Sequence, residues 1–367
     1  MSNEKDWKAN WERTKERFGA WWKGDLTESP LVCLPIMKKN PEPPEAVPGN
    51  DDPRRRRTDP DVALANFRNY LRAYDFAADS YPGFDADFGP GSLALYLGCE
   101  PVFAEDTVWY RECVSDSWEN RPIAFDENNP WWRLHYQMVK KAAEMSGGDY
   151  LVNIPDLIEN VDTLASMRGT TNTCYDLIDE PELMKRRLSE LDEVYFRYYD
   201  RLYDAVKDEN GGSSFAAFQV WGPGRTAKVQ CDFSALMSPE QYREFIVPSL
   251  TKQCGRLDFS IYHLDGPGAV KHLGALMEIE PLRALQWTAG NGQPDGADEK
   301  WYFIYDKVME AGKSLWIHVG EGSAGELVEK ARRLVRRYGV RATYLLFPHV
   351  DAETGEEILK AAAKGFR

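Results

Sequence analysis

The chain has 367 residues, a formal net charge of −14 and a sequence pI of about 5.0, so its average surface would repel nucleic acid. Its N-terminal stretch is charged, and no segment comes near the roughly 18 apolar residues that a membrane span needs. We therefore expect a cytoplasmic protein with no nucleic-acid partner and no membrane partner.

The first predicted element is a helix over residues 7–22, with apolar residues at helical spacing and a stop near Gly24. A short apolar strand follows at 31–36. Residues 38–60 are rich in proline and charge and have no periodicity, which predicts a loop or insertion. The arginines at 54–57 within it form either a solvated patch or a clamp over an anionic ligand at the mouth of a pocket.

From residue 61 onward, helical patterns alternate with short apolar runs, which is typical of parallel βα units. No GxGxxG follows the first strand and no GxxxxGK[ST] occurs, so a nucleotide-binding sheet is disfavoured. We predict an α/β fold, a (β/α)8 TIM barrel with an N-terminal helical extension, in a single domain of residues 1–367. Helices are expected at 61–79, 130–146, 180–208, 239–254, 298–311, 322–338 and 354–365, and strands at 149–153, 215–219, 258–263, 283–287, 313–319 and 342–347.

Chemistry in such a barrel belongs at the carboxyl ends of the strands. His263 and Asp265 follow a predicted strand, and side chains two residues apart in a strand point to the same side. Imidazole and carboxylate are ordinary zinc ligands, and a catalytic zinc usually takes three protein ligands. His349, at the last strand end, is the candidate third ligand. The alternative is a histidine that is hydrogen-bonded to a turn aspartate.

Other polar and aromatic residues also fall at predicted strand ends or turns. Asp85 and Asp87 alternate in the segment PGFDADFGPG, either as a surface turn or as a pair that lines a pocket for a cationic or N–H-bearing ligand. His318 is either a ligand-binding residue or a buried, hydrogen-bonded imidazole. The further candidates for contact with a small-molecule substrate are Trp221, Arg225 and Trp287, of which the tryptophans could equally be core residues.

Cysteine usage argues against a disulfide framework and against a nucleophilic hydrolase. Six cysteines are scattered without a CxxC motif, which suits a reducing compartment and small buried thiols. No GxSxG is present, and no cysteine lies near a histidine in a recognisable signature.

Several stretches, in this order and spacing, resemble the uroporphyrinogen decarboxylase superfamily, which has a (β/α)8 barrel. The true decarboxylases bind their polycarboxylate substrate with an N-terminal motif of the MRQAGRY type, where this chain has LPIMKKNPEPPE with lysines instead. The stretches that carry the resemblance span nearly the whole chain: WERTKERFGAWWKGDLTESPLVCLPI, NVDTLASMRG, DLIDEPELMKRRL, SALMSPEQYREFIVPSL, YHLDG and FPHVDAETGEEILKAA.

The pattern is closest to the branch that moves a methyl group between a corrinoid protein and a thiol such as coenzyme M. That resemblance implies a zinc site built from a histidine and two cysteine thiolates, at positions that match His263, Asp265 and about His349 here. A His/Asp/His set would leave the zinc near one unit of positive charge and harder than the thiolate site. It implies a methyltransferase that acts with a methylcorrinoid on a partner protein, with His263 and Asp265 as catalytic residues.

The resemblance leaves two further points open. A decarboxylase-like or tetrapyrrole-binding protein without metal is the alternative function. The decarboxylase members also suggest an even number of subunits, such as a homodimer.

Overall fold

The computed structural model describes residue 8 and residues 10–367. The first helix, α1 (Trp11–Lys23), ends at Gly24, whose φ of 68° is the left-handed conformation that glycine adopts readily at helix ends. The predicted stop is therefore confirmed. Residue 7, where we expected this helix to begin, lies outside the described residues.

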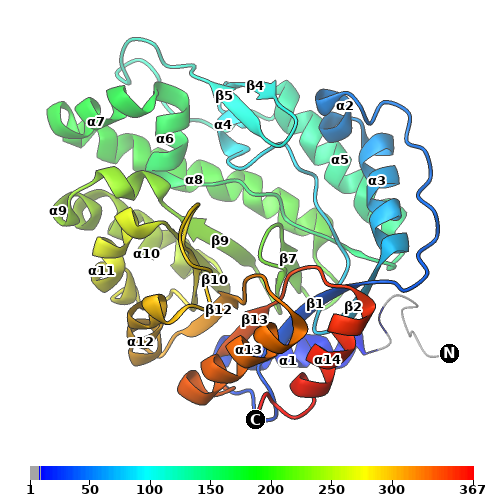
Figure 1. The fold of residues 1–367 in the computed structure, drawn as a ribbon. Coiled ribbons are helices and arrows are strands. Elements are labelled where there is room, and N and C mark those ends of the chain that lie inside the picture. The colour runs from blue at the N-terminus through cyan, green and yellow to red at the C-terminus, as the bar shows by residue number, and fades with distance from the viewer. Residues whose placement is uncertain (1–7, 9) are drawn as a thin grey trace.

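A seven-stranded sheet forms the centre of the molecule (Figure 1). Its order is β2-β1-β13-β12-β11-β10-β9, in which β2 is antiparallel to β1 and every other neighbouring pair is parallel. The strands are β1 (Leu31–Met37), β2 (Tyr74–Ala78), β9 (Thr226–Gln230), β10 (Phe259–Asp265), β11 (Ala284–Thr288), β12 (Ser314–His318) and β13 (Thr343–Leu346).

Three pairs of short strands lie outside this sheet. β3 (Gly83–Phe84) pairs in parallel with β6 (Leu151–Val152), β4 (Glu100–Phe103) pairs with β5 (Val108–Arg111), and β7 (Ser213–Phe215) pairs with β8 (Val220–Gly222). The predicted α/β class with a mostly parallel sheet is confirmed. Complete closure into an eight-stranded barrel remains a prediction, because the continuous ladder of strands runs only from β2 to β9.

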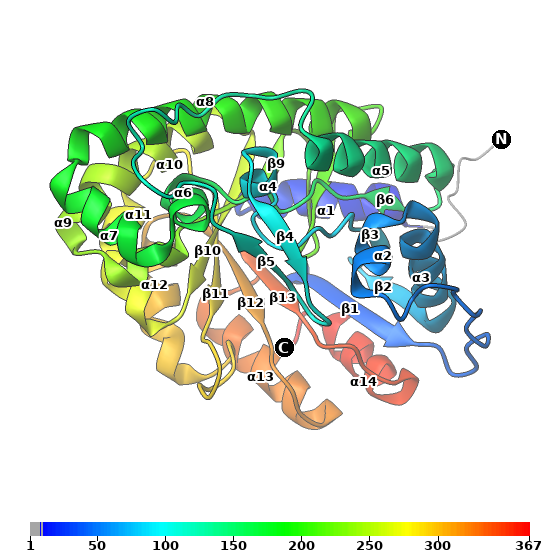
Figure 2. The same ribbon diagram turned by 90° about the horizontal axis from the view of Figure 1, so that it is seen from above.

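Helices surround the strands, as Figure 2 shows from above. Pro53, Pro60, Pro130 and Pro181 occupy the first turn of four of them, where a missing N–H costs nothing. The other α-helices are α2 (Pro53–Thr58), α3 (Pro60–Ala73), α4 (Leu93–Tyr96), α5 (Pro130–Ser146), α6 (Asn160–Arg168), α7 (Thr170–Asp179), α8 (Pro181–Val206), α9 (Pro239–Gln241), α10 (Val247–Arg256), α11 (Leu273–Met277), α12 (Tyr302–Glu310), α13 (Ala324–Tyr338) and α14 (Ala352–Ala362).

The face of the sheet that points away from the outer helices carries a compact aromatic cluster. Trp316 and Tyr344 from β12 and β13 pack there with Trp21 and Trp22 of α1 and with Trp221 of β8. The indole of Trp21 donates a hydrogen bond to the carbonyl of Leu315 at 3.2 Å, and that of Trp22 donates to the carbonyl of Trp221 at 2.9 Å. Because buried indole N–H groups need such partners, α1 is fixed in place over the amino ends of the strands.

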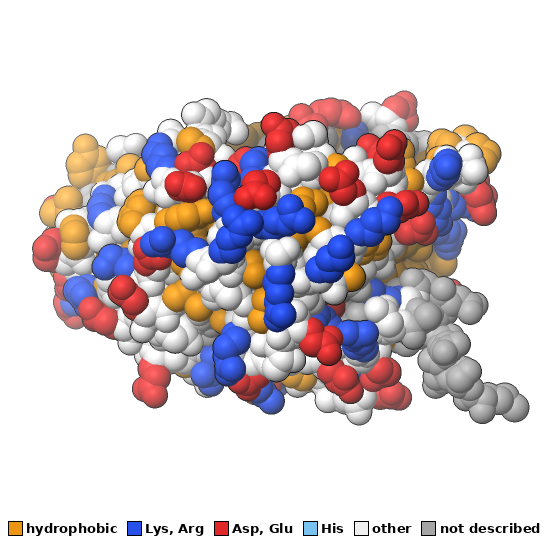
Figure 3. Space-filling view, turned by 60° about the horizontal axis from the view of Figure 1, so that its bottom comes forward, with side chains coloured by type: hydrophobic (Ala, Val, Ile, Leu, Met, Phe, Trp, Pro, Cys, Tyr) orange, Lys and Arg blue, Asp and Glu red, His pale blue; other side chains and the backbone are white. Residues whose placement is uncertain are grey.

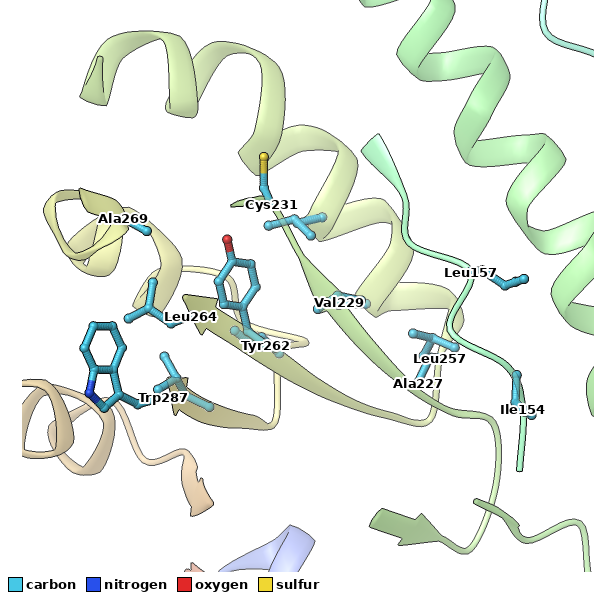
Figure 4. Close-up of a cluster of buried hydrophobic side chains, with 14 of the residues drawn as sticks. Ile154, Leu157, Ala227, Val229, Cys231, Leu257, Tyr262, Leu264, Ala269 and Trp287 are labelled. Atoms are coloured by element: carbon cyan, nitrogen blue, oxygen red, sulfur yellow. The ribbon is translucent and has the colours of Figure 1, made fainter. Parts of the chain in front are cut away.

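The opposite face of the sheet packs against helices in a second, larger core. Figure 4 shows Val229, Tyr262 and Leu264 on the side of β9 and β10 that faces the helices, with Trp287 of β11 beside them. These residues alternate with the polar residues of the same strands, as the period of two in a strand requires. Each strand thus has one face in this outer core and an inner face on the side of the aromatic cluster.

Three predictions about local structure are wrong. The helix expected at 61–79 ends at Ala73, and Tyr74–Ala78 forms the edge strand β2 instead. The segment 38–60 contains a short helix, α2, which begins where the Asp52 side chain accepts hydrogen bonds from the N–H groups of Arg54 and Arg55. The expected strand at 215–219 ends at Phe215 instead, and the next parallel strand of the sheet is β9, which we did not predict. The other predicted strands overlap observed ones.

Charged side chains of both signs cover much of the surface, and Lys and Arg gather on the face shown in Figure 3. On α13, Arg337 pairs with Asp306 at 2.7 Å and Arg336 pairs with Glu329 at 3.5 Å, so part of the positive charge of this helix is balanced locally. Within the described part of the chain, no helix has the length and apolar character to cross a membrane.

Candidate metal centre

Polar side chains lie side by side where β9, β10 and β11 end. His263 on β10 is in register with Gln230 on β9 and with Gln286 on β11, and Asp265 is in register with Thr288. Because alternate residues of a strand point to one face, these side chains share the inner face of the sheet. The carboxyl end of the sheet therefore presents a polar layer above the aromatic cluster.

Three of the side chains at this end are close enough to hold one metal ion. Ligand atoms of Asp232, His263 and Asp265 all lie within 4.8 Å of one another. His263 and Asp265 are the last alternating residues of β10, and Asp232 comes two residues after the end of β9. The structure thus brings together the pair expected from the sequence and adds Asp232 to it.

Hydrogen bonds fix the tautomer of His263. Its Nδ1 lies against Oε1 of Gln286, and the amide nitrogen of Gln286 donates to the Thr288 hydroxyl at 2.8 Å. The oxygen of Gln286 is an acceptor only, so Nδ1 carries the proton and Nε2 keeps its lone pair. A histidine that binds a metal is commonly oriented by such a bond from its other ring nitrogen.

The surroundings also keep His263 neutral. Burial lowers its pKa, and the positive charge of Lys228 lowers it further, against the opposing effects of Gln286 and the nearby carboxylates. The imidazole is therefore ready to bind a metal without first losing a proton.

Asp232 is held by a neighbouring amide and by the charge around it. Gln230 Nε2 donates to Asp232 at 3.0 Å and to Asp162 at 3.2 Å, while Asp162 also accepts the backbone N–H groups of Asp232 and Phe233, each at 2.8 Å. Burial and the repulsion from Asp162 raise the pKa of Asp232 to about 7. A cation bound here would relieve that repulsion.

Beneath this group lies a buried ion pair between Lys228 on β9 and Asp156, at 2.7 Å. Lys228 also contacts the side-chain oxygen of Gln230, which orients that amide toward Asp232. Glu159, only 2% exposed, accepts the backbone N–H of Gln230 at 2.6 Å, and burial raises its pKa to about 8. Among the described residues around the site, the positive charge of Lys228 therefore acts on several carboxyl groups at once.

A strained turn between β7 and β8 covers the inner side of His263. Ala217, Phe218 and Gln219 all have positive φ, between 46° and 58°, which costs a non-glycine residue about 1–2 kcal/mol each. The Trp316 indole donates to the carbonyl of Phe218 at 2.8 Å, and this fixes the turn from below. The Phe218 ring centroid lies 5.3 Å from that of His263. Strain of this kind often accompanies a functional site.

Asp85 and Asp87 follow β3 and line a cavity of about 490 Å³ together with residues of α2 and α3. Asp85 accepts a hydrogen bond from the Asn153 amide, and the protein around it disfavours its charge and raises its pKa to about 6. Asp87 forms an ion pair with Arg57 of α2. The two aspartates line a pocket, and the basic segment contributes two arginines to it, Arg57 paired with Asp87 and Arg56 paired with Glu105.

His349 lies apart from the group of three. Its Nε2 is 3.2 Å from the hydroxyl of Tyr70 on α3, and its ring centroid is 4.8 Å from that of Tyr74. The bridge between Ile36 and Val350 ties this segment to the far edge of β1, which turns His349 toward α3 and β2. The structure therefore replaces His349 by Asp232 in the candidate ligand set.

Two residues expected at the carboxyl ends of strands lie elsewhere. Arg225 precedes β9 and pairs with Asp200, so the predicted position at a carboxyl end is wrong. Trp221 is buried in the aromatic cluster, where its ring centroid lies 5.9 Å from that of Trp11. Both expectations depended on reading the strand before residue 220 as part of the sheet, and neither residue lies at the carboxyl end of the sheet.

Two further candidates lie on neighbouring strands with different surroundings. Trp287 is 1% exposed and packs against Trp301 in the outer core, with ring centroids 4.9 Å apart; it is a core residue. His318, half-buried at the carboxyl end of β12, has its pKa lowered by burial and remains a substrate-binding candidate.

The donor set of Asp232, His263 and Asp265 fits a divalent cation such as Zn²⁺, which takes imidazole and carboxylate ligands. Two carboxylates formally neutralise Zn²⁺, as two thiolates would, so the positive charge expected for a His/Asp/His set does not arise. The oxygen donors are nonetheless harder than sulfur.

Sequence reasoning missed Asp232 because it missed β9. The segment TAKVQ alternates polar and apolar residues, which is the pattern of a strand with one polar face. Recognition of that alternation would have placed Lys228, Gln230 and Asp232 on the inner face of a strand.

Comparison with solved structures finds a similar overall fold. A methyltransferase from Methanosarcina mazei matches with a TM-score of 0.63 and 14% sequence identity, over 96% of this chain and 99% of that chain. A B12-independent methionine synthase from Shewanella sp. W3-18-1, in complex with selenomethionine, has a TM-score of 0.42 at 8% identity over 74% of each chain, too low to support an argument. No protein-family model and no curated protein sequence matches the chain. At these identities the likeness shows the fold alone.

Proposed function

We propose that this chain is a metal-dependent methyltransferase that moves a methyl group to or from a corrinoid carried by a partner protein. The observation that carries the proposal is the group of Asp232, His263 and Asp265 at the carboxyl end of the sheet. The fold shared with a methyltransferase over nearly the full length of both chains supports it. The resemblance in sequence to the corrinoid branch of the uroporphyrinogen decarboxylase superfamily supports the corrinoid.

Each residue of the site has a distinct task in this proposal. Asp232, His263 and Asp265 hold a zinc ion, which when bound supplies Lewis-acid activation of the methyl acceptor. Gln286 keeps the proton on Nδ1 of His263, which leaves the lone pair of Nε2 free to bind a metal. Gln230 positions the carboxylate of Asp232. The ring of Phe218 shields the inner side of His263 from water.

The charge of the site selects the methyl acceptor. The cavity is lined by Asp85, Asp87, Arg56 and Arg57, and both arginines are paired with carboxylates. Around the metal group, the carboxylates of Asp156 and Asp162 interact with Lys228, which pairs with Asp156. In the described part of the chain, the carboxylates around the metal group outnumber its one lysine, which disfavours an anionic acceptor and favours a neutral or positively charged one. We therefore propose an amine or uncharged acceptor, with Asp85 and His318 as substrate contacts.

Metal analysis tests the ligand assignment directly. Protein purified without chelator and then incubated with zinc is compared as wild type, His263→Ala and His349→Ala. Wild type and His349→Ala should bind zinc stoichiometrically, because His349 lies outside the group, whereas His263→Ala should lose it. Zinc retained equally by all three proteins would remove the metal site from the proposal.

The reaction is tested by following the absorbance of methylcobalamin in the presence of thiol, amine and hydroxyl acceptors. The expected result is demethylation with an uncharged or amine acceptor that depends on His263. If the protein binds zinc but the methylcobalamin spectrum stays unchanged with every acceptor, methyl transfer is contradicted and the metal site is not.

The alternative function is a metal-free decarboxylase-like or tetrapyrrole-binding protein. It requires cations to hold a polycarboxylate substrate, but the two arginines of the cavity, Arg56 and Arg57, are paired with Glu105 and Asp87, and the cavity also presents Asp85. The charge distribution therefore favours the methyltransferase. Loss of carboxyl groups from a porphyrinogen, measured by mass spectrometry, would favour the decarboxylase over the methyltransferase.

A further inference from the structure

Two cysteines lie together at the base of the β4–β5 hairpin, away from the metal centre. Cys99 immediately precedes β4, Cys113 follows the end of β5, and Glu100 and Arg111 form the last paired position of the hairpin between them. The two sulfur atoms are 3.6 Å apart. A disulfide needs a sulfur separation of about 2.05 Å, so a shift of roughly 1.5 Å would join them.

The two thiols differ in their access to solvent. Cys99 is fully buried, and its sulfur also lies 3.6 Å from the carbonyl of Ser166 on α6. Cys113 is half-buried, and its backbone N–H donates to the carbonyl of Met167 at 2.8 Å. A small oxidant can therefore reach the Cys113 thiol first, because the Cys99 thiol is buried behind it.

The surroundings also make Cys113 the more reactive thiol. Cys99 donates a hydrogen bond to the sulfur of Cys113, and the positive charge of Arg121 lies nearby, and together these lower the pKa of Cys113. The pKa of Cys99 is raised by that same contact and by burial. An accessible thiol of lowered pKa beside a buried second thiol is the arrangement of an attacking and a resolving cysteine.

We propose that Cys99 and Cys113 form a reversible disulfide on reaction with a low-molecular-weight disulfide such as oxidised glutathione. The Cys113 thiolate attacks one sulfur of the oxidant, forms a mixed disulfide and releases one thiolate. Cys99 then attacks the Cys113 sulfur and expels the second thiolate, which takes up the Cys99 proton. One oxidant molecule is reduced to two thiols while two protein thiols become one disulfide.

The bond would close the base of a hairpin that packs on the loop after β3. The Tyr110 hydroxyl on β5 donates to the carbonyl of Phe88 at 3.1 Å, next to Asp87 of the cavity. Oxidation would therefore fix β4 and β5 to each other beside this loop and against the end of α6.

The test treats the native wild-type chain with oxidised glutathione, quenches with acid, alkylates the remaining thiols and maps the peptides by mass spectrometry. We expect the loss of two free thiols, a peptide pair linked through Cys99 and Cys113, and full recovery with dithiothreitol. Cys174, the other half-buried cysteine, serves as the control: Cys174→Ser should behave as wild type.

The single variants separate the two steps. Cys99→Ser should accumulate a stable glutathione adduct on Cys113, because the resolving thiol is gone, and Cys113→Ser should form neither adduct nor disulfide at this pair. A stable adduct on Cys113 in the wild type, or a Cys99 thiol that remains free throughout, would overturn the proposal even if no variant folds.

Discussion

His263 on β10 and Gln286 on β11 face each other in register, and the Gln286 side-chain oxygen accepts a hydrogen bond from the Nδ1–H of His263. The amide cannot easily turn over, because its nitrogen donates to Thr288 at 2.8 Å. One pair of neighbouring strands thus sets both the orientation and the tautomer of the histidine that would bind a metal.

Replacement of Gln286 should weaken metal binding without removing a ligand. In Gln286→Leu, Nδ1 loses its acceptor, so we expect zinc affinity to fall about 10–100-fold, as is typical for a residue that orients a ligand. Gln286→Glu keeps an acceptor and should bind more tightly than Gln286→Leu. Competition with a chromophoric chelator measures the affinity, with Gln293→Leu in an exposed loop as the control. Equal affinity in all variants would disprove the role of this hydrogen bond.

Asp232→Asn should weaken zinc binding more than Gln286→Leu does, by more than roughly 100-fold, because it removes a charged ligand. The matched control is Asp87→Asn, since Asp87 is also an aspartate but follows β3 and pairs with Arg57 outside the group of three. Competition with the same chromophoric chelator measures the zinc affinity of both aspartate variants. A larger loss in Asp87→Asn would point to a site in the cavity instead.

The stability of the fold should depend on pH through Glu159. Burial raises the pKa of Glu159 from 4.5 to about 8. Between these values the folded chain holds a proton that the unfolded chain has released, so the free energy of unfolding falls as pH rises through this window. Glu159→Gln cannot ionise and should lack this part of the decline, which amounts to at most a few kcal/mol.

Urea unfolding at several pH values measures that decline. Glu357→Gln, an exposed residue of α14, is the control and should follow the wild type. If the stability of Glu159→Gln falls across the same window as steeply as that of the wild type, another group is responsible.

The left-handed turn at 217–219 should tolerate glycine at its first position. Ala217 has φ of 55°, so Ala217→Gly removes strain and should raise the free energy of unfolding by up to about 1 kcal/mol. Ala216, its buried neighbour, is not in the left-handed region, and Ala216→Gly should instead destabilise the chain. Chemical denaturation compares them, and the same sign of change in both variants would contradict the strain argument.

The fold class could be predicted because parallel strands covered on both faces appear as short apolar runs between helical patterns. β9 could not be found in that way, because Lys228 and Gln230 on its inner face interrupt the run with polar residues. Asp232, which follows β9, was therefore missed as well. His263 and Asp265 were found because β10 is apolar up to the point where its inner face becomes polar.

The error about His349 has a different physical origin. The residue follows β13, as predicted, but the parallel bridge from Val350 to Ile36 carries the chain outward to β1, and the imidazole meets Tyr70 instead of His263. A pairing of this kind between segments far apart in the sequence leaves no local pattern. The two carboxylates that do meet His263 come from adjacent strands of the same sheet.

The aromatic cluster under the sheet links the first helix to the site mechanically. The rings of Trp21 on α1 and Tyr344 are 5.5 Å apart, the Tyr344 hydroxyl donates to the carbonyl of Gln219 at 2.7 Å, and Phe218 in the same turn rests against His263. A change in α1 that shifts Trp21 would thus be transmitted to the imidazole through rigid, close-packed rings. A helix with no residue in the candidate metal group would then govern how accurately the histidine is aligned.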